Sequence, residues 1–261
     1  MEIIQDIKKW QAIRNSLSSD ITIGFVPTMG CLHQGHASLI NQSVGQNDIT
    51  VLSIFVNPTQ FNDPQDYERY PKNSEADLVL AKALKVNYVI MPEINDLYPG
   101  GNDISVATDH LFSQILEGRC RPGHFNGVLT IVMKLLMLVR ADHVYFGEKD
   151  YQQYFLITEL IKKYFIQTKI ILCPTVRELS GLPLSSRNTR LSADERKCIE
   201  LFYEFFYHNR SHSLAEIKEK ILALKMQYDY LEVHNDRFFM ALKIGCIRII
   251  DNFKEATRYV H

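Results

Sequence analysis

The chain has 261 residues, of which 46% are hydrophobic and 23% are charged. That length and apolar content can supply one large core, or a medium core with a smaller domain beside it. Lysine and arginine number 29 and aspartate and glutamate 30. Because these charges nearly cancel, no broad basic surface is expected to hold nucleic acid or an anionic membrane, and phosphate chemistry must use local charge.

The five cysteines are widely spaced, odd in number and form no C-x-x-C pair. This pattern argues against a disulfide framework and predicts a reducing, cytoplasmic location. The N-terminal segment mixes charged and apolar side chains at helical spacing and has no apolar signal core. The most apolar stretch, 128–139, is too short to span a membrane and carries Lys134, so we interpret it as a buried helix.

Apolar, β-branched runs alternate with helical patterns through the first two thirds of the chain, which is typical of a parallel sheet covered by helices. The expected strands are 21–26, 49–56, 88–91, 143–146 and 169–172, and the expected helices are 36–46, 74–85, 126–140 and 150–165. This order predicts an α/β fold with a doubly wound parallel sheet, which binds ligands at the carboxyl ends of its strands.

The composition changes near residue 180. All nine prolines lie at or before Pro183, and of the twelve glycines only Gly245 follows Gly181. Two helical patterns, 193–207 and 214–225, then precede strand-like runs at 228–234 and 240–250. We therefore expect two domains: a large α/β domain over 1–176 and a small α+β domain over 177–261.

The first expected strand leads into Pro-Thr-Met-Gly-Cys-Leu-His-Gln-Gly-His at 27–36, followed directly by a helix. A helix N-terminus offers unpaired N–H groups and a positive dipole end, both suited to phosphate. His33 and His36 can donate to phosphoryl oxygens as charge develops, and Gly30 and Gly35 allow close backbone approach. A tight turn with two incidental histidines explains the motif equally well. A metal pair is weaker, because no nearby Cys or carboxylate completes a ligand set.

Two further polar segments adjoin expected elements, one at the end of the second strand and one immediately before the apolar helix. The segment 55–61 carries Asn57 and Gln60 where the second strand should end, although an ordinary strand exit explains it as well. The segment 118–125 places two arginines and His124 among glycines. Arginine offers a fixed fork of donors for an anion, and a solvated loop is the alternative.

Two more polar segments, 146–153 and 177–188, carry groups that can bind phosphate. In 146–153, Lys149 can meet a phosphate as a point charge, while Asp150 can cap the next helix or hold Mg²⁺ through water. In 177–188, two hydroxyls, an arginine and an amide can clamp a triphosphate, although they also suit a polar linker. Four of the five segments coincide with strand ends or helix starts, which favours one ligand site at the edge of the sheet.

Taken in order, PTMGCLHQGH, FVNPTQF, GRCRPGHFNGV, FGEKDYQQ and LSSRN resemble the pantothenate synthetase (pantoate–β-alanine ligase) family of the H-x-G-H nucleotidylyltransferase superfamily. The resemblance covers about residues 20–190 and continues weakly through YDYLEV and RIIDNF. It implies a Rossmann-like ATP-binding domain, a small C-terminal lid domain and a homodimer. It also implies a ligase of the coenzyme A pathway, in which pantoate attacks MgATP to give pantoyl adenylate and pyrophosphate, and β-alanine then displaces AMP.

The resemblance also implies roles for individual residues. The catalytic and phosphate-contacting residues would be His33, His36, Lys149 and Arg187, and the pantoate-binding residues Gln60, Gln153 and Met29. The ATP site would share Met29 and add Pro27, Thr28, Gly35, Gly147, Asp150, Val176, Leu184, Ser185 and Ser186. Tyr70, Arg121 and His124 would lie near β-alanine, with Asp150 (through water) and Asp77 near Mg²⁺.

The chain departs from the usual family pattern in places. Ser180 replaces Asp, Pro183-Leu184 replaces Ala-Met, Cys31 replaces Ala and Gln34 replaces Glu, and the C-terminal domain is expected to be shorter than usual. None of these changes removes a group with an obvious chemical role.

Two other functions compete with the ligase hypothesis. One is an adenylyltransferase that moves AMP to a phosphate acceptor. The paired glutamines Gln60 and Gln153 argue against it, because they suit a hydroxy acid better than a phosphate. The other is a nucleotide-sensing protein with an inactive site, and the presence of His33, His36, Lys149 and Arg187 argues against that function.

Overall fold

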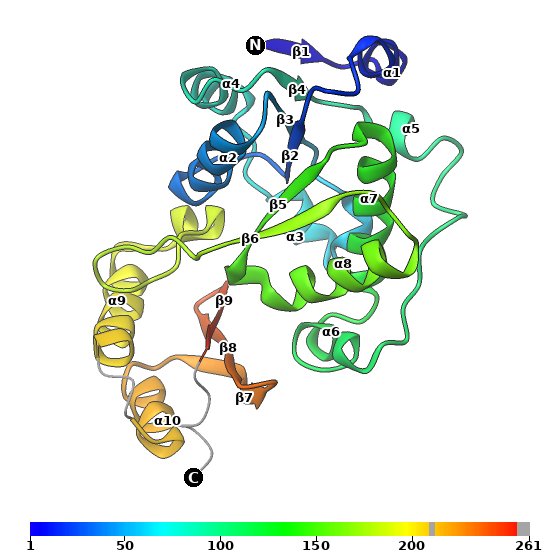
Figure 1. Cartoon of the computed structure of the whole chain (residues 1–261). Helices are drawn as coiled ribbons and strands as arrows, with labels where there is room; N and C mark the ends of the chain where they lie inside the picture. The colour runs from blue at the N-terminus through cyan, green and yellow to red at the C-terminus, as the bar shows by residue number, and fades with distance from the viewer. Residues whose placement is uncertain (209–211, 255–261) are drawn as a thin grey trace. The chain divides into compact units, whose positions relative to one another are not determined.

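The structure is a computed structural model that describes residues 1–208 and 212–254. It divides into two compact units (Figure 1). The first contains Met1–Gly147 and Gln152–Cys173, and the second contains Glu148–Tyr151 and the chain from Pro174 on. The second unit thus begins near the expected boundary, but it also includes a short segment that we expected in the first domain.

The first unit is built on a six-stranded parallel sheet with strand order β1-β4-β3-β2-β5-β6. The strands are β1 (Glu2–Ile4), β2 (Ile23–Thr28), β3 (Ile49–Ile54), β4 (Tyr88–Ile90), β5 (His143–Gly147) and β6 (Lys169–Cys173). This confirms the doubly wound α/β fold and the expected strands. The three-residue β1 was missed, because it lies in a segment with helical spacing and is held by pairing with the distant β4.

Helices cover both faces of this sheet. Core residues of α1 (Ile7–Ser16), α7 (His124–Val139) and α8 (Tyr151–Lys163) form one cluster with the sheet, and those of α2 (Gln34–Gln46) and α4 (Ser74–Ala83) form another. The alternation of strand side chains produces this division, since Phe25 belongs to the first cluster and its neighbour Val26 to the second. α7 is the buried helix expected from its apolar sequence. None of the described helices is both long and apolar enough to cross a membrane.

Short helices occupy the connections of the first unit. They are α3 (Pro64–Glu68), α5 (Ile94–Leu97) and α6 (Glu117–Cys120), with the 3₁₀ helices η1 (Pro58–Gln60) and η2 (Leu111–Ser113). A further 3₁₀ helix, η3 (Glu148–Asp150), follows β5 and belongs to the second unit.

The strand order reverses direction between β2 and β5, which is the topological switch point of the sheet. Only two residue pairs join these strands, Gly24↔His143 and Phe25↔Val144. Pro27, near the end of β2, has no N–H to continue a ladder. The carboxyl ends of β2 and β5 are therefore unpaired with each other, as expected where a doubly wound sheet binds its ligand.

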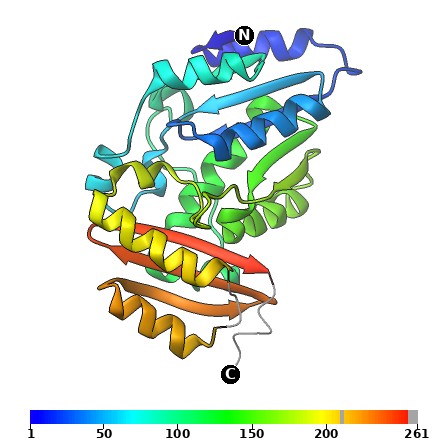
Figure 2. The same cartoon turned by 90° about the vertical axis from the view of Figure 1, so that its left-hand side faces the viewer.

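The second unit has a three-stranded antiparallel sheet, β7 (Gln227–His234), β8 (Arg237–Ile244) and β9 (Ile247–Lys254). Its core joins the sheet to α9 (Ala193–His208) and α10 (Leu214–Ala223), which Figure 2 shows alongside it. The 3₁₀ helix η4 (Ser186–Arg190) precedes α9. This is the expected small α+β arrangement.

One expected strand is wrong. The run 240–250 is not continuous, because β8 ends at Ile244, Gly245 turns with φ +54°, and β9 begins at Ile247. The preceding hairpin turns at Asn235 and Asp236, which both have positive φ. Positive φ at both central residues matches the twist of the flanking strands and is favoured by Asn and Asp.

Candidate active site

The two histidines of the H-x-G-H motif cap the N-terminus of α2. His33 is the N-cap residue, and its Nδ1 accepts a hydrogen bond from the Gly35 N–H at 3.1 Å. In return, Nδ1 of His36 accepts from the His33 N–H at 3.3 Å. A neutral ring whose Nδ1 accepts must carry its proton on Nε2, so the cap fixes both imidazoles as Nε2–H donors. Their ring centroids are 4.1 Å apart, which places two donors side by side at the positive end of the helix.

A buried carboxylate shapes the loop before this helix. Asp77, on α4, is 3% exposed and accepts from the backbone N–H groups of Cys31 and Leu32 at 2.8 and 2.6 Å. Gly30 has φ +81°, and a Cβ there would lie 2.9 Å from the Asp77 carboxylate. Burial, followed by the Asp77 charge, raises the pKa of the Cys31 thiol, which favours the uncharged form. Asp77 therefore holds the loop through both carboxylate oxygens.

Gln60 is oriented by a network around Asn57, which is 1% exposed. The Asn57 Nδ2 donates to Gln60 Oε1 at 3.1 Å and to the Gly127 carbonyl of α7 at 3.2 Å. Asn57 Oδ1 accepts from the Tyr98 hydroxyl at 2.8 Å. With its Oε1 engaged, Gln60 turns its Nε2 toward the sulfur of Met29, 3.2 Å away. Two predicted pantoate-binding residues, Gln60 and Met29, therefore lie in contact.

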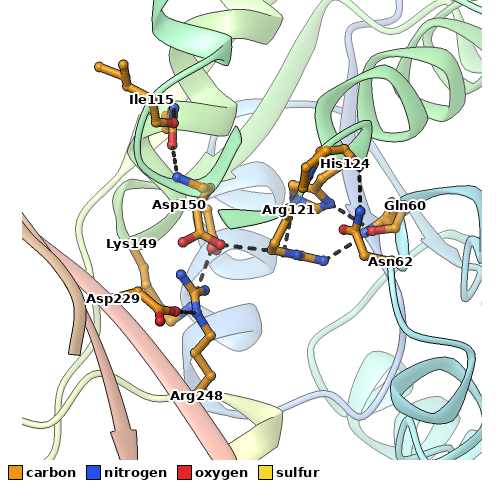
Figure 3. A network of polar contacts seen from close by, with 12 residues as sticks. Gln60, Asn62, Ile115, Arg121, His124, Lys149, Asp150, Asp229 and Arg248 are labelled. Atoms are coloured by element: carbon orange, nitrogen blue, oxygen red, sulfur yellow. Dashed lines mark hydrogen bonds and ion pairs between the residues drawn. The ribbon is translucent and has the colours of Figure 1, made fainter. Parts of the chain in front are cut away.

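Arg121 and His124 meet at the backbone of Gln60 (Figure 3). The Arg121 Nη2 donates to the Gln60 carbonyl at 3.1 Å, and Nδ1 of His124 lies 2.8 Å from the same oxygen. Arg121 also contacts His124 Nε2 at 3.2 Å and the Glu117 carboxylate at 3.6 Å. Tyr70 is buried, and its ring packs edge-on against Phe61, next to Gln60. The residues predicted near β-alanine thus adjoin those predicted for pantoate.

The two adjacent glutamines of α8 differ in their surroundings. Gln152 is buried, donates to the carbonyls of Phe112 and Ile115, and accepts from the Glu117 N–H. Gln153, the predicted pantoate ligand, is half-buried one position later. The first glutamine therefore fixes the helix against the preceding loop, and Gln153 stays the predicted pantoate ligand of this pair.

In the second unit, Lys149 and Asp150 lie in η3, directly after Gly147 ends β5. The Lys149 Nζ is 3.4 Å from Asp150 Oδ1. Within the described residues, no cluster of three or more His, Cys, Asp or Glu side chains is arranged to hold a metal ion. Asp150 is partly exposed and can reach a hydrated ion through water, whereas both oxygens of Asp77 accept backbone hydrogen bonds.

The segment between β6 and α9 forms a tight loop followed by η4. Leu184 N–H donates to the Val176 carbonyl at 3.0 Å, which brings these two predicted ATP contacts together. Ser185 caps η4, because its Oγ accepts from the Arg187 N–H at 3.3 Å. Ser186 is buried and Arg187 is half-buried. The predicted clamp residues Ser185, Ser186 and Arg187 are therefore consecutive around one helix start.

Comparison with known proteins decides the family. A family model described as Pantoate-beta-alanine ligase matches residues 2–254. The chain belongs to the pantoate-beta-alanine ligase family. It is 45% identical over 257 residues to a pantothenate synthetase of Francisella tularensis subsp. mediasiatica, and 46% identical over 257 residues to one of subsp. tularensis. Each alignment covers 98% of both chains.

Solved structures of the pantoate-beta-alanine ligase family share this fold. One is a crystal structure of pantoate-beta-alanine ligase from Francisella tularensis complexed with beta-gamma ATP and beta-alanine, with TM-score 0.94, 46% identity and 97% coverage of both chains. Another is pantothenate synthetase from Thermus thermophilus, with TM-score 0.88, 34% identity, and coverage of 97% of this chain and 99% of that one. The C-terminal domain is therefore not shortened relative to these two structures, contrary to our expectation.

Sequence reasoning missed several residues that support the ligase family's motifs in this chain. Gly127 is one, because a Cβ there would lie 2.3 Å from the Thr59 carbonyl of η1. Tyr98 is another, since its hydroxyl holds Asn57. Neither residue lies in a polar motif, and their partners are distant in sequence. Only the glycine inside an apolar helix pattern gave a signal, as such glycines often mark a close approach of another backbone.

Proposed function

We propose that the chain is an ATP-dependent ligase that joins pantoate to β-alanine and releases AMP and pyrophosphate. The observation that carries the proposal is the His33–His36 capping box at the start of α2, in a chain that matches the pantoate-beta-alanine ligase family over residues 2–254. The Francisella tularensis relative complexed with beta-gamma ATP and beta-alanine supports two of the three substrates. Pantoate is the acid that the family description supplies.

The first step forms a mixed anhydride. A pantoate carboxylate oxygen attacks the α-phosphorus of ATP, the bond from that phosphorus to the bridging oxygen breaks, and pyrophosphate leaves with the electron pair. Negative charge grows on the phosphoryl oxygens. The Nε2–H groups of His33 and His36, with the positive end of α2, stabilise that charge. No proton transfer is needed from either ring.

The second step forms the amide. The β-alanine amine attacks the acyl carbon of pantoyl adenylate, the bond from that carbon to the AMP oxygen breaks, and the nitrogen loses its proton. Adenylation makes this possible, because a free carboxylate has no good leaving group. We assign Arg121, His124 and Tyr70 to the β-alanine side, since they adjoin Gln60 and Arg121 suits a carboxylate.

Gln60 and Gln153 are the proposed pantoate ligands, with Met29 beside them. Asn57 occupies the Oε1 of Gln60, so this side chain presents its N–H donors to the substrate. Those donors suit a carboxylate or the oxygen of a hydroxyl group. The arrangement supports a hydroxy acid as substrate, with the Met29 sulfur beside the Gln60 amide as a further contact.

The ATP site combines backbone and side-chain groups. Around the end of β2 and the start of α2 lie three of its proposed residues, Pro27, Thr28 and Gly35. The other residues proposed to line the nucleotide are Gly147, Val176 and Leu184. The proposed triphosphate clamp consists of Lys149 in η3 and of Ser185, Ser186 and Arg187 in the proposed lid, residues 177–261. Their charge and hydroxyl groups match a phosphate chain.

Mg²⁺ is the proposed companion of ATP, and it would neutralise phosphate charge when bound. Such ions keep several waters and use one or two carboxylates with the substrate phosphates. Asp150 fits that pattern as a water-mediated contact, because its carboxylate is partly exposed beside Lys149. Asp77 is the less favoured contact, since each of its oxygens already accepts a hydrogen bond from a backbone N–H group.

A homodimer in the cytoplasm is the proposed working form. The family resemblance supports the dimer, and sedimentation of the purified chain tests it. The cytoplasmic location is supported by five cysteines that are all unpaired in the structure.

The decisive experiment is isotope exchange between pyrophosphate and ATP. Exchange that depends on pantoate and needs no β-alanine is expected, because adenylation is reversible before the amine reacts. Pantothenate should then form when β-alanine is added. Exchange that appears only with β-alanine contradicts the two-step order. Transfer of AMP to a phosphate acceptor, with no response to pantoate, favours the adenylyltransferase instead.

A further inference from the structure

The small sheet of the second unit uses its two faces differently. Phe238, Met240 and Phe253 point into the core shared with α9 and α10. The alternate residues Arg237, Phe239 and Asn252 therefore project from the opposite face, and Phe239 pairs with Asn252 across β8 and β9. This second face holds the segment Glu148–Tyr151, which belongs to the same unit although it lies about 100 residues earlier in the chain.

Asn252 binds the backbone on which Lys149 sits. Its Nδ2 donates to the carbonyl of Glu148 at 2.9 Å and to the carbonyl of Lys149 at 2.8 Å. Asn252 is 4% exposed, so water does not readily replace these bonds. Because both hydrogens of one amide are used, the side chain fixes two successive peptide groups of η3 rather than one.

Arg237 completes the attachment from the neighbouring strand. Its Nη1 donates to Asn252 Oδ1, which fixes the direction of the Asn252 amide, and its Nη2 contacts the Glu148 carboxylate at 2.7 Å. The guanidinium also lies over the Tyr151 ring, 4.0 Å from its centroid. Arg237 is 5% exposed. The segment is thus held at its first two carbonyls, at one carboxylate and at the ring that follows it.

These contacts have a consequence for catalysis. Within the segment Glu148–Tyr151, only Lys149 has the positive charge that the proposed triphosphate contact needs. The Lys149 Nζ lies 3.4 Å from Asp150 Oδ1. Its position depends on the backbone of η3, which Asn252 and Arg237 fix. Misplacing a group by about 1 Å can cost about 100-fold in rate, even when the change lies away from the chemistry.

We infer that Asn252 and Arg237 are positioning residues, which hold Lys149 where it stabilises the charge that develops on phosphate during adenylation. The inference rests on the proposed function, because it gives Lys149 its task. Neither residue is among the proposed substrate contacts. Both act through the Glu148–Lys149 backbone, so their loss affects the transition state more than the binding of ATP.

The test uses pantoate-dependent exchange between pyrophosphate and ATP in the full-length chain. Asn252→Asp keeps the size of the side chain and the acceptor for Arg237, but removes both donors to the carbonyls. We expect its kcat to fall about 10- to 100-fold, with the KM for ATP near the wild-type value. Asn252→Ala should behave similarly. Ile249→Val is the matched control, because Ile249 is buried in β9 on the core face and its loss of one methylene should leave kcat unchanged.

A double-mutant cycle separates positioning from a general loss of structure. In a Lys149→Ala background, Asn252→Asp should cause almost no further loss, because it acts through the missing side chain. Fully additive losses overturn the inference, as does a wild-type kcat in Asn252→Asp, or a raised KM for ATP alone. If the wild-type chain shows no pantoate-dependent exchange, the proposed function fails instead, so the two failures are distinguishable.

Discussion

Arg177 and Asp251 form a bidentate ion pair inside the second unit, with Nη1 to Oδ2 at 2.6 Å and Nη2 to Oδ1 at 2.9 Å. Asp251 is 2% exposed, and the guanidinium lies 4.5 Å from the centroid of the Phe253 ring. Burial by itself lowers the pKa of Arg177, but the hydrogen bond and charge of Asp251 outweigh it and leave that pKa raised. Arg177 also donates to the Gly181 carbonyl at 3.0 Å, so the pair ties the loop before the clamp residues to β9.

Removing one partner should destabilise the second unit strongly. Asp251→Asn leaves the Arg177 charge buried without a counter-charge, which typically costs about 3–5 kcal/mol. Hydrogen exchange measures the loss locally, at the β8 and β9 amides for Asp251→Asn and at the β1 and β4 amides for a control in the first unit. Glu2→Gln is the control, because the Lys9–Glu2 pair is about half exposed and worth less than about 1 kcal/mol. Equal effects of the two substitutions would show that burial adds nothing to the Arg177–Asp251 pair.

A second prediction concerns the close approach of α7 and η1. Gly127→Ala places a Cβ 2.3 Å from the Thr59 carbonyl and 2.8 Å from the Gln60 N–H, and both are backbone atoms that cannot rotate away. The displaced η1 should move the Gln60 amide, so kcat/KM for pantoate should fall by about 10-fold or more.

The matched control for that substitution is Gly45→Ala in α2. A Cβ at Gly45 meets nothing within 4 Å, and alanine is favoured in a helix interior, so stability should rise slightly with activity unchanged. Steady-state kinetics at varied pantoate, with circular dichroism to confirm folding, gives the comparison. An unaltered kcat/KM in Gly127→Ala would show that η1 tolerates the shift.

The architecture of the first unit was predictable because its signals are local. Each parallel strand is a short apolar run, each helix has its own periodicity, and the polar motifs follow the strands directly. The attachment of Lys149 to Asn252 was not predictable in this way. Nothing near Glu148–Tyr151 indicates that its carbonyls are bound by a residue about 100 positions later. By its contacts this segment groups with the second unit, whereas its sequence neighbours belong to the first.

Within the proposed site too, local motifs were predictable and contacts between distant residues were not. Sequence motifs indicated His33, His36 and Gln60, because these residues follow predicted strands at the edge of the sheet where an open α/β fold binds its ligand. The motifs could not show that Asn57 fixes the Gln60 amide, or that both oxygens of Asp77 accept hydrogen bonds from the loop before α2. The sequence does not show which atom of the Asn57 amide bonds Gln60, or which groups bond the two oxygens of Asp77. Only the tertiary structure determines these contacts.

A third prediction concerns pH and the buried Cys173 at the end of β6. Burial raises the pKa of its thiol from 9.0 to about 11. The folded state therefore holds the proton more tightly than the unfolded state, so this stabilising contribution is complete below pH 9 and is lost as the pH rises to about 11. At pH 10 the loss should be about 1.4 kcal/mol.

Urea unfolding of the first unit measures this contribution. Trp10, the single tryptophan, is fully buried there, so its fluorescence reports that unit. The wild type should lose more stability between pH 8 and pH 10 than Cys173→Ala, which has no thiol to ionise. The comparison cancels the titration of other groups. Equal losses in the two proteins would mean that Cys173 does not ionise on unfolding.

The last prediction separates the two roles of His36. Its Nδ1 caps α2 by accepting from the His33 N–H, and its Nε2–H is the proposed donor to phosphate. Asparagine offers an acceptor near the position of Nδ1 and nothing at Nε2. His36→Asn should therefore keep the cap and nearly wild-type stability, whereas His36→Ala should lose about 1 kcal/mol. Both should lower the exchange rate about 100- to 1000-fold, because each lacks the donor.

His110 provides the matched control for this experiment. Its Nδ1 also caps a helix start, since it accepts from the Phe112 N–H at 3.1 Å at the beginning of η2, but no substrate contact is proposed for it. His110→Asn should leave the exchange rate unchanged, so a loss in His36→Asn alone traces to the Nε2–H group. If His36→Asn retains the wild-type exchange rate, the imidazole acts only as a cap. The stabilisation of phosphoryl charge must then come from the α2 backbone and His33.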